Sequence, residues 1–251
     1  MTTKTLFALD FDGVICDSAV ETAMTAWKAA QGIWPDMHDQ AITDKHIQQF
    51  RTIRPSLEFG YEAILIIRLL HQGMTVSELF ENYHLQLQSL IKSDDLCVDA
   101  LKDSFGQTRD NEIQQDEAAW IASNPFFEGI AEKLKILEHD DWTIITTKQE
   151  RFVKHILQGN DIQLDGSRIY GLDRKLNKQE VLKHIKASYP ERPITFIEDR
   201  LPTLFGVLED PDLQGIHVQL ADWGYNTEAE RNVAQENAIE VIGKKDFLRV
   251  V

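Results

Sequence analysis

The sequence TLFALDFDGVICDS, residues 5–18, begins with an apolar run and passes directly into a cluster of acidic residues. The run TLFAL occupies residues 5–9, and Asp10, Asp12 and Gly13 follow it. A continuous apolar run of this length that ends at a glycine turn is typical of a strand in a parallel sheet, because helices cover both faces of such a sheet. Residues 5–9 are therefore predicted to form a buried strand.

Four later segments have the same apolar character, and helical patterns separate them. Phe152, Val153, Ile156 and Leu157 recur at helical spacing, and Lys178–Ser188 shows a similar pattern. Strands that alternate with single helices predict the α/β class, with a Rossmann-like, doubly wound parallel sheet. The predicted strands after the first are Trp142–Thr146, Pro193–Ile197, Gly215–Leu220 and Ala238–Ile242.

The stretch 18–124 differs from the rest, because strand patterns disappear and helical patterns dominate. Glu62–His71 predicts a helix that ends near Gly73, and Asn111–Ser123 predicts another. Thr75 and Glu78 form a capping-box pattern ahead of an apolar stripe over Val76–Ile91 that has helical spacing. The simplest organisation is an α/β core of residues 1–17 and 125–251 with an α-helical domain, residues 18–124, inserted after the first strand.

Composition limits the classes of function. The 251 residues include 26 Lys and Arg against 41 Asp and Glu, a formal charge of −15, which disfavours binding along nucleic acid. The apolar segment 63–70 is interrupted by Arg68 and is too short to span a membrane. Cys16 and Cys97 show no metal-ligand spacing, and residues 6–9 are too short for a secretory leader. A cytoplasmic protein is predicted, and its oligomeric state is left open.

Asp10 and Asp12 stand where the first predicted strand ends. Ligands bind at the carboxyl ends of the strands in open α/β sheets. Two neighbouring carboxylates repel each other and call for a cation or a shared proton, and Mg²⁺ is the hard cation that takes such oxygen ligands. Gly13 would let the backbone approach a ligand closely. An acidic turn that only ends a strand has the same pattern, so this motif needs support from elsewhere in the chain.

Three later features supply that support. Thr146 and Thr147 follow an apolar strand, Lys178 opens a helix, and Glu198-Asp199 ends another strand. Each feature alone is common. In this order on successive β/α units, and together with Asp10, they describe the nucleophile, hydroxyl, cation and metal ligands of a phosphoryl-transfer site.

These motifs resemble those of the haloacid dehalogenase-like hydrolases, in the subfamily that contains phosphoglycolate phosphatase. The resemblance covers the whole core, about 144 residues if 18–124 is set aside, and the stretch 18–124 resembles the helical cap domain of that family. Its motifs are residues 10–18, 146–148, 178–182 and 198–199, together with a late Trp-Gly-Tyr loop within 221–225.

The resemblance implies a role for each matched residue. Asp10 would be the nucleophile that forms an aspartyl-phosphate, and Asp12 would be the general acid and then the general base. Mg²⁺ would be held by Asp10, the backbone carbonyl of Asp12 and Asp199, with Glu198 nearby or acting through water. The phosphate would be bound by Thr146, the Thr147 loop, Lys178 and the backbone amides near Phe11 and Gly13.

The resemblance also implies a function: a Mg²⁺-dependent phosphatase acting on a small phosphorylated metabolite. Asp12 favours phosphoryl transfer, since dehalogenases of the superfamily lack this acid. Two alternatives stay open, a phosphosugar mutase with the same aspartate pair and a non-catalytic binding or regulatory module. Thr203 stands where many relatives have a further aspartate, and Thr147 stands where many have asparagine. Arg51 and Arg54 are interpreted as a solvated helix face, with substrate contact as the alternative.

Overall fold

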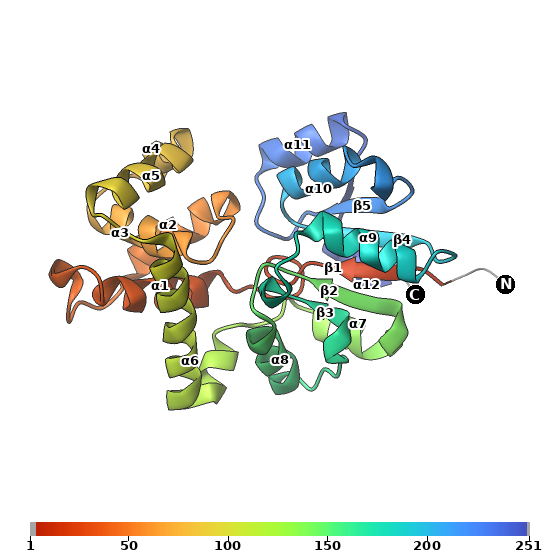
Figure 1. Ribbon diagram of the computed structural model, residues 1–251, viewed down its shortest axis with the longest axis horizontal. Helices are drawn as coiled ribbons and strands as arrows, with labels where there is room; N and C mark the ends of the chain where they lie inside the picture. The colour runs from red at the N-terminus through yellow and green to blue at the C-terminus, as the bar shows by residue number, and fades with distance from the viewer. Residues whose placement is uncertain (1–3, 250–251) are drawn as a thin grey trace. The chain divides into compact units, whose positions relative to one another are not determined.

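The computed structural model describes residues 4–249, and they form two compact units (Figure 1). One unit comprises Met1–Asp17 and Pro125–Val251, and the other comprises Ser18–Asn124. The chain divides at the same residues in the sequence analysis. Among residues 4–249, no helix is long and apolar enough to cross a membrane.

The first unit is an α/β domain built on a six-stranded parallel sheet in the order β3-β2-β1-β4-β5-β6. In β1, Phe7 pairs with Trp142 on one side and with Thr195 on the other. The chain runs outward from β1 to β3 and then returns to β4 on the other side of β1. The direction of winding therefore reverses between β1 and β4, where ligands bind in folds of this kind. The strands are β1 (Leu6–Leu9), β2 (Trp142–Ile145), β3 (Ile169–Tyr170), β4 (Ile194–Glu198), β5 (His217–Ala221) and β6 (Glu240–Ile242).

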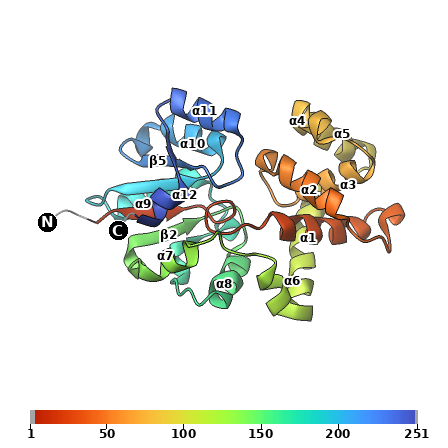
Figure 2. The ribbon, with the colours of Figure 1, turned by 180° about the vertical axis from the view of Figure 1, so that it is seen from behind.

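Helices cover both faces of this sheet, which explains the continuous apolar strands. Leu6 and Ala8 of β1 pack with Val181 of α9 and Leu204 of α10, whereas Phe7 meets the ring of Phe247 in α12. Accordingly, α9 lies in front of the sheet in Figure 1 and α12 in front of it in Figure 2. The helices of this unit are α7 (Ile130–Ile136), α8 (Glu150–Gly159), α9 (Lys178–Ser188), α10 (Leu201–Leu208), α11 (Glu228–Glu236) and α12 (Lys244–Arg249).

The predicted α/β class is confirmed, and the strand predictions hold to within a few residues. The short strand β3 was not predicted, because two residues are too few to form a pattern. The last strand begins at Glu240 rather than at Ala238, which has a φ of 58°. A left-handed residue of this kind belongs to the turn that precedes the strand.

The second unit is entirely helical in its regular structure. Buried apolar side chains from all six of its helices form one core, among them Trp27, Phe50, Leu65, Leu79, Leu87 and Phe105. A buried Arg109 also donates two hydrogen bonds of 2.7 Å to the buried carboxylate of Glu21. The helices are α1 (Ala19–Gln31), α2 (Asp44–Ile53), α3 (Glu62–His71), α4 (Val76–Glu81), α5 (Tyr83–Ser93) and α6 (Val98–Ala122).

Three predictions for this unit need correction. The stripe over Val76–Ile91 is two helices, because Asn82 leaves the helical region with φ −140° and ψ 38°. The predicted helix at Asn111–Ser123 is the end of α6, which is kinked at Asp116 (φ −157°, ψ 88°). Arg54 is buried in a 3₁₀ turn after α2 and does not share a solvated helix face with the exposed Arg51.

The predicted capping box at the start of α4 is present and gives a test of local stability. The Thr75 hydroxyl accepts from the Glu78 amide, and the Glu78 carboxylate accepts from the Thr75 amide at 2.8 Å. Thr75→Ala should lower the free energy of unfolding by about 1 kcal/mol. The matched control is Thr52→Ala in α2, where the hydroxyl only donates to the Gln48 carbonyl of its own helix. Urea unfolding of both variants tests this prediction, and equal losses would contradict it.

Candidate active site

Three buried acidic residues meet where the winding of the sheet reverses. Asp10 directly follows β1, Glu198 is the last residue of the adjacent β4, and Asp199 comes next. One carboxylate oxygen from each lies within 4.8 Å of the others. The register of two parallel neighbours brings these side chains together, as the sequence analysis expected for the carboxyl ends of the strands.

Lys178 lies against two of these carboxylates. Its Nζ is 2.9 Å from Asp10 Oδ1 and 2.6 Å from Glu198 Oε2. The residue opens α9, where Asn177 and Glu180 form a capping box that fixes the start of the helix. Burial lowers the pKa of Lys178, but Asp10 and Glu198 outweigh burial and raise this pKa above its ordinary value. Lys178 is therefore a permanent cation in the site.

One lysine does not balance the charge of three carboxylates. Burial raises the pKa of Asp10 to about 7, the charge of Glu198 adds to this effect, and Lys178 opposes it. When Asp10 is ionised, the three carboxylates and one ammonium leave two net negative charges in a region removed from water. The donors are all carboxylate oxygens, which are the ligands that Mg²⁺ prefers. The residues present therefore fit a divalent hard cation in both charge and chemistry.

The two oxygens of Glu198 are already engaged. Oε2 contacts Lys178, and Oε1 accepts from the backbone amide of Arg200 at 3.1 Å. Asp199 Oδ2 accepts from the backbone amide of Tyr225 at 2.7 Å. Thr203 lies in the first turn of α10.

A second lysine in the site has no role in the sequence analysis. Lys148 is buried, and its Nζ donates to Asp12 Oδ1 at 2.9 Å. Its position directly after Thr146 and Thr147 at the end of a strand was the only available indication. The Lys148 contact holds the carboxyl group of Asp12 in place.

The predicted phosphate-binding residues differ in their surroundings. Thr146 is buried and its hydroxyl oxygen accepts from the Lys148 amide at 3.1 Å, whereas Thr147 is exposed. Phe11 is fully buried. The Gly13 amide donates to the Cys16 carbonyl at 2.9 Å, so the tight turn uses the donor that was predicted to bind phosphate.

Two glycines allow the backbone to pack closely around Asp199. Gly13 has a φ of +93°, and a Cβ there would clash with the carboxylate of Asp199. A Cβ at Gly224 would clash with the Cβ of Asp199 and lie 2.5 Å from the Gly13 carbonyl oxygen. The loop after β1 and the loop after β5 therefore enclose Asp199 from two sides.

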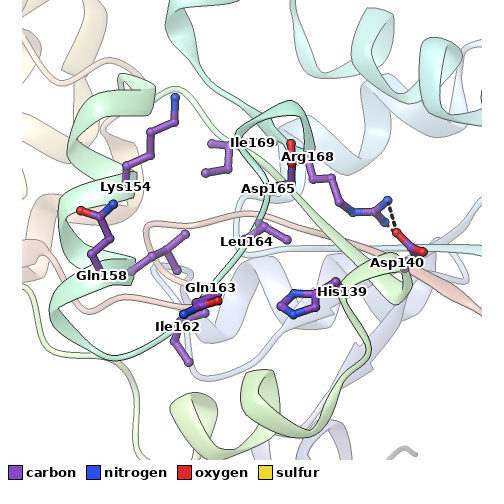
Figure 3. Close-up of a pocket in the computed structure, with 11 residues that line it drawn as sticks. His139, Asp140, Lys154, Gln158, Ile162, Gln163, Leu164, Asp165, Arg168 and Ile169 are labelled. Carbon is purple, nitrogen blue, oxygen red and sulfur yellow. Dashed lines mark hydrogen bonds and ion pairs between the residues drawn. The ribbon is translucent and has the colours of Figure 1, made fainter.

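A cavity of about 600 Å³ lies elsewhere in the core unit, between α8 and the segments that precede β2 and β3 (Figure 3). It is next to the amino ends of these strands, away from the carboxylates. Arg168 lines this cavity, and its guanidinium donates to the carbonyls of Trp142 and Asp140 and to the hydroxyl of Tyr189. These bonds connect neighbouring segments and give Arg168 a structural role.

Comparison with known proteins identifies the fold. The sequence matches no protein-family model and no curated protein sequence. Among solved structures, a predicted phosphoglycolate phosphatase from Haemophilus somnus has a TM-score of 0.60 and 16% identity, covering 99% of this chain and 96% of that one. A haloacid dehalogenase-like protein of unknown function from Agrobacterium tumefaciens has a TM-score of 0.56 and 15% identity, with coverage of 98% and 95%.

A third solved structure is a haloacid dehalogenase family hydrolase from Deinococcus radiodurans with bound phosphate and sodium. Its TM-score is 0.56 at 15% identity, and the match covers 99% of this chain and 95% of that one. These likenesses extend over nearly the full length of both chains. The chain has the haloacid dehalogenase-like fold, and the resemblance inferred from the sequence motifs is confirmed at the level of the fold.

Proposed function

We propose that this chain, which has the haloacid dehalogenase-like fold, is a Mg²⁺-dependent phosphatase that hydrolyses a small phosphorylated metabolite in the cytoplasm. The observation that carries the proposal is the buried group of Asp10, Glu198, Asp199 and Lys178 at the carboxyl ends of β1 and β4. Two of the similar structures support it, since one is named as a predicted phosphoglycolate phosphatase and the other contains phosphate. The charge of −15 favours a small substrate over nucleic acid.

In the proposed reaction, Asp10 attacks the phosphorus atom of the substrate. The bond between phosphorus and the leaving oxygen breaks, Asp12 gives its proton to that oxygen, and Asp10 becomes an aspartyl-phosphate. Asp12 then takes a proton from a water molecule whose oxygen attacks phosphorus. The bond between phosphorus and Asp10 breaks, and inorganic phosphate leaves.

The other residues stabilise charged groups and orient the reacting side chains in this scheme. Lys178 stabilises the ionised form of Asp10, and Lys148 orients Asp12. The Thr146 hydroxyl is positioned to donate to a phosphoryl oxygen. Asp10, Asp199 and the backbone carbonyl of Asp12 would hold Mg²⁺, with Glu198 set aside by its bonds to Lys178 and Arg200. When bound, Mg²⁺ would supply positive charge against the phosphate and the nucleophile.

Phosphate release from p-nitrophenyl phosphate and a panel of metabolite phosphates tests the proposal. Release should require Mg²⁺ and stop with EDTA. Asp199→Asn should lower the rate at 1 mM Mg²⁺ by at least about 100-fold, because it removes a charged ligand. The matched control is Asp246→Asn, since Asp246 is exposed on α12 and pairs only with Arg249 among the ion pairs of the described residues.

Two outcomes would contradict the phosphatase. Conversion of hexose 1-phosphates to hexose 6-phosphates without release of phosphate would indicate the mutase. Mg²⁺ binding with no turnover of any substrate would indicate a binding or regulatory module.

A further inference from the structure

We infer that Tyr225 positions Asp199 by connecting the carboxylate of this residue to Asp17. The inference rests on the proposed Mg²⁺ site. The backbone amide of Tyr225 donates to Asp199 Oδ2 at 2.7 Å, and its phenol hydroxyl donates to Asp17 Oδ1 at 2.8 Å. One residue therefore contacts both a proposed metal ligand and a carboxylate on the loop after β1.

The backbone around Asp17 is held in place by hydrogen bonds. Asp17 is the last residue of the core before the chain enters the helical unit. Its amide donates to the Pro125 carbonyl at 2.8 Å, and the Phe127 amide donates to the Ile15 carbonyl at 3.1 Å. The outgoing and returning segments of the chain are thus joined to each other where Asp17 receives the Tyr225 hydroxyl.

The rest of the loop is held at its two ends. On one side, Trp223 donates from its indole to the Val14 carbonyl at 3.0 Å and stacks on Phe247 with ring centroids 5.8 Å apart. On the other, the Asn226 side chain donates to the carbonyls of Asp199 and Ala221. Between these fixed points, the hydroxyl of Tyr225 connects the middle of the loop to Asp17.

The orientation of the Asp199 carboxylate should therefore depend on the hydrogen bond between the Tyr225 hydroxyl and Asp17, although Asp199 takes no part in that bond. The acceptor, Asp17, is a carboxylate, and hydrogen bonds to charged groups are stronger than neutral ones. Loss of the hydroxyl would let the loop relax and weaken the amide contact with Asp199 Oδ2. Outer partners of metal ligands typically change metal affinity by 10- to 100-fold when they are mutated.

Calorimetric titration with Mg²⁺ tests the inference without any turnover. Tyr225→Phe should raise the Kd for Mg²⁺ by about tenfold, with kcat for p-nitrophenyl phosphate at saturating Mg²⁺ within about twofold of wild type. Asp17→Ala should give the same shift, and the double variant should be no worse than either single one. Asp17→Asn keeps an acceptor oxygen and should restore most of the affinity. Tyr189→Phe is the matched control, because that hydroxyl contacts Arg168 near the amino ends of the strands.

Three results would overturn the inference. The first is an unchanged Kd for Mg²⁺ in both Tyr225→Phe and Asp17→Ala, even if the apoprotein becomes less stable. The second is addition of the two effects in the double variant, and the third is wild type that binds no Mg²⁺. Failure of the phosphatase proposal would look different, since wild type would release no phosphate while Tyr225→Phe still weakened Mg²⁺ binding.

Discussion

Asp10→Asn should lower phosphate release by about a thousandfold or more, because it replaces the proposed nucleophile with a neutral amide of the same shape. The fold should survive, since the amide oxygen can still accept from Lys178. Brief reaction with a substrate followed by acid quenching and intact-mass analysis should show an added phosphoryl group on wild type only. Retention of more than a tenth of the wild-type rate would exclude Asp10 as the nucleophile.

The same variant should change how stability depends on pH. The raised pKa of Asp10, about 7 against an ordinary value of 3.8, means that the folded state holds the proton of Asp10 more tightly than the unfolded state does. The stability of the wild-type apoprotein relative to Asp10→Asn should therefore fall between pH 4 and 7, by at most about 4 kcal/mol. Above pH 7 the difference should be constant. Urea unfolding in EDTA at pH 5 and pH 8 measures the stability of wild type relative to Asp10→Asn, and a relative stability that rises with pH would contradict this assignment.

Lys178→Met should destabilise the apoprotein by about 3–5 kcal/mol at pH 8, because it leaves Asp10 and Glu198 buried beside each other without their cation. The loss should be smaller at pH 5.5, where Asp10 binds a proton. Phosphate release should also fall sharply, since ionised Asp10 is no longer favoured. Thermal and urea unfolding at the two pH values provide the measurement.

The matched control is Lys183→Met, which lies on the same helix. Lys183 is partly exposed and contacts Asp210 and Asp212 at about 3 Å on the surface. Surface ion pairs contribute about 1 kcal/mol or less, so this variant should remain near wild type in stability and activity. Equal losses in the two variants would show that α9 needs its lysines for a reason other than the buried carboxylates.

The sequence analysis predicted the α/β class well because its evidence was local. The apolar run at residues 5–9, the alternation of strands and helices after residue 125 and the helical stretch 18–124 can each be recognised within a short window. The helix at Glu62–His71 was predicted to the residue, since Gly73 ends it with a φ of +93°. Patterns of this kind depend on burial along one segment, which sequence shows directly.

Helix interruptions were not predictable in the same way. The stripe over Val76–Ile91 keeps its apolar spacing across Asn82, although the helix is interrupted there. Helix α6 continues through a kink at Asp116, whose carboxylate caps the final turns. In each case the apolar spacing continues across a residue whose φ and ψ are not helical. A hydrophobic stripe indicates which residues are buried and does not mark where the backbone leaves the helix.

In the candidate site, the residues at strand ends were predictable and their partners were not. Asp10 and Asp199 follow apolar strands, so their positions could be read from the chain. Contacts such as Lys148 with Asp12 and Tyr225 with Asp17 join residues that are 136 and 208 positions apart. Neither contact leaves a mark in local sequence, because each depends on the register of strands that meet only in the folded sheet.

The insertion of the helical unit between β1 and β2 has a consequence for folding during synthesis. Phe7 pairs with Trp142 in the sheet, and at roughly 5–20 residues per second the ribosome needs about 7–27 s to make the intervening chain. All of residues 18–124 leave the ribosome before β2 does. The helical unit can therefore form first on the nascent chain. During that time the apolar β1 lacks its partner strands and is accessible to chaperones. Slow codons placed shortly after residue 124 would lengthen the time for which β1 lacks its partner strands. We expect them to increase aggregation of the newly made protein.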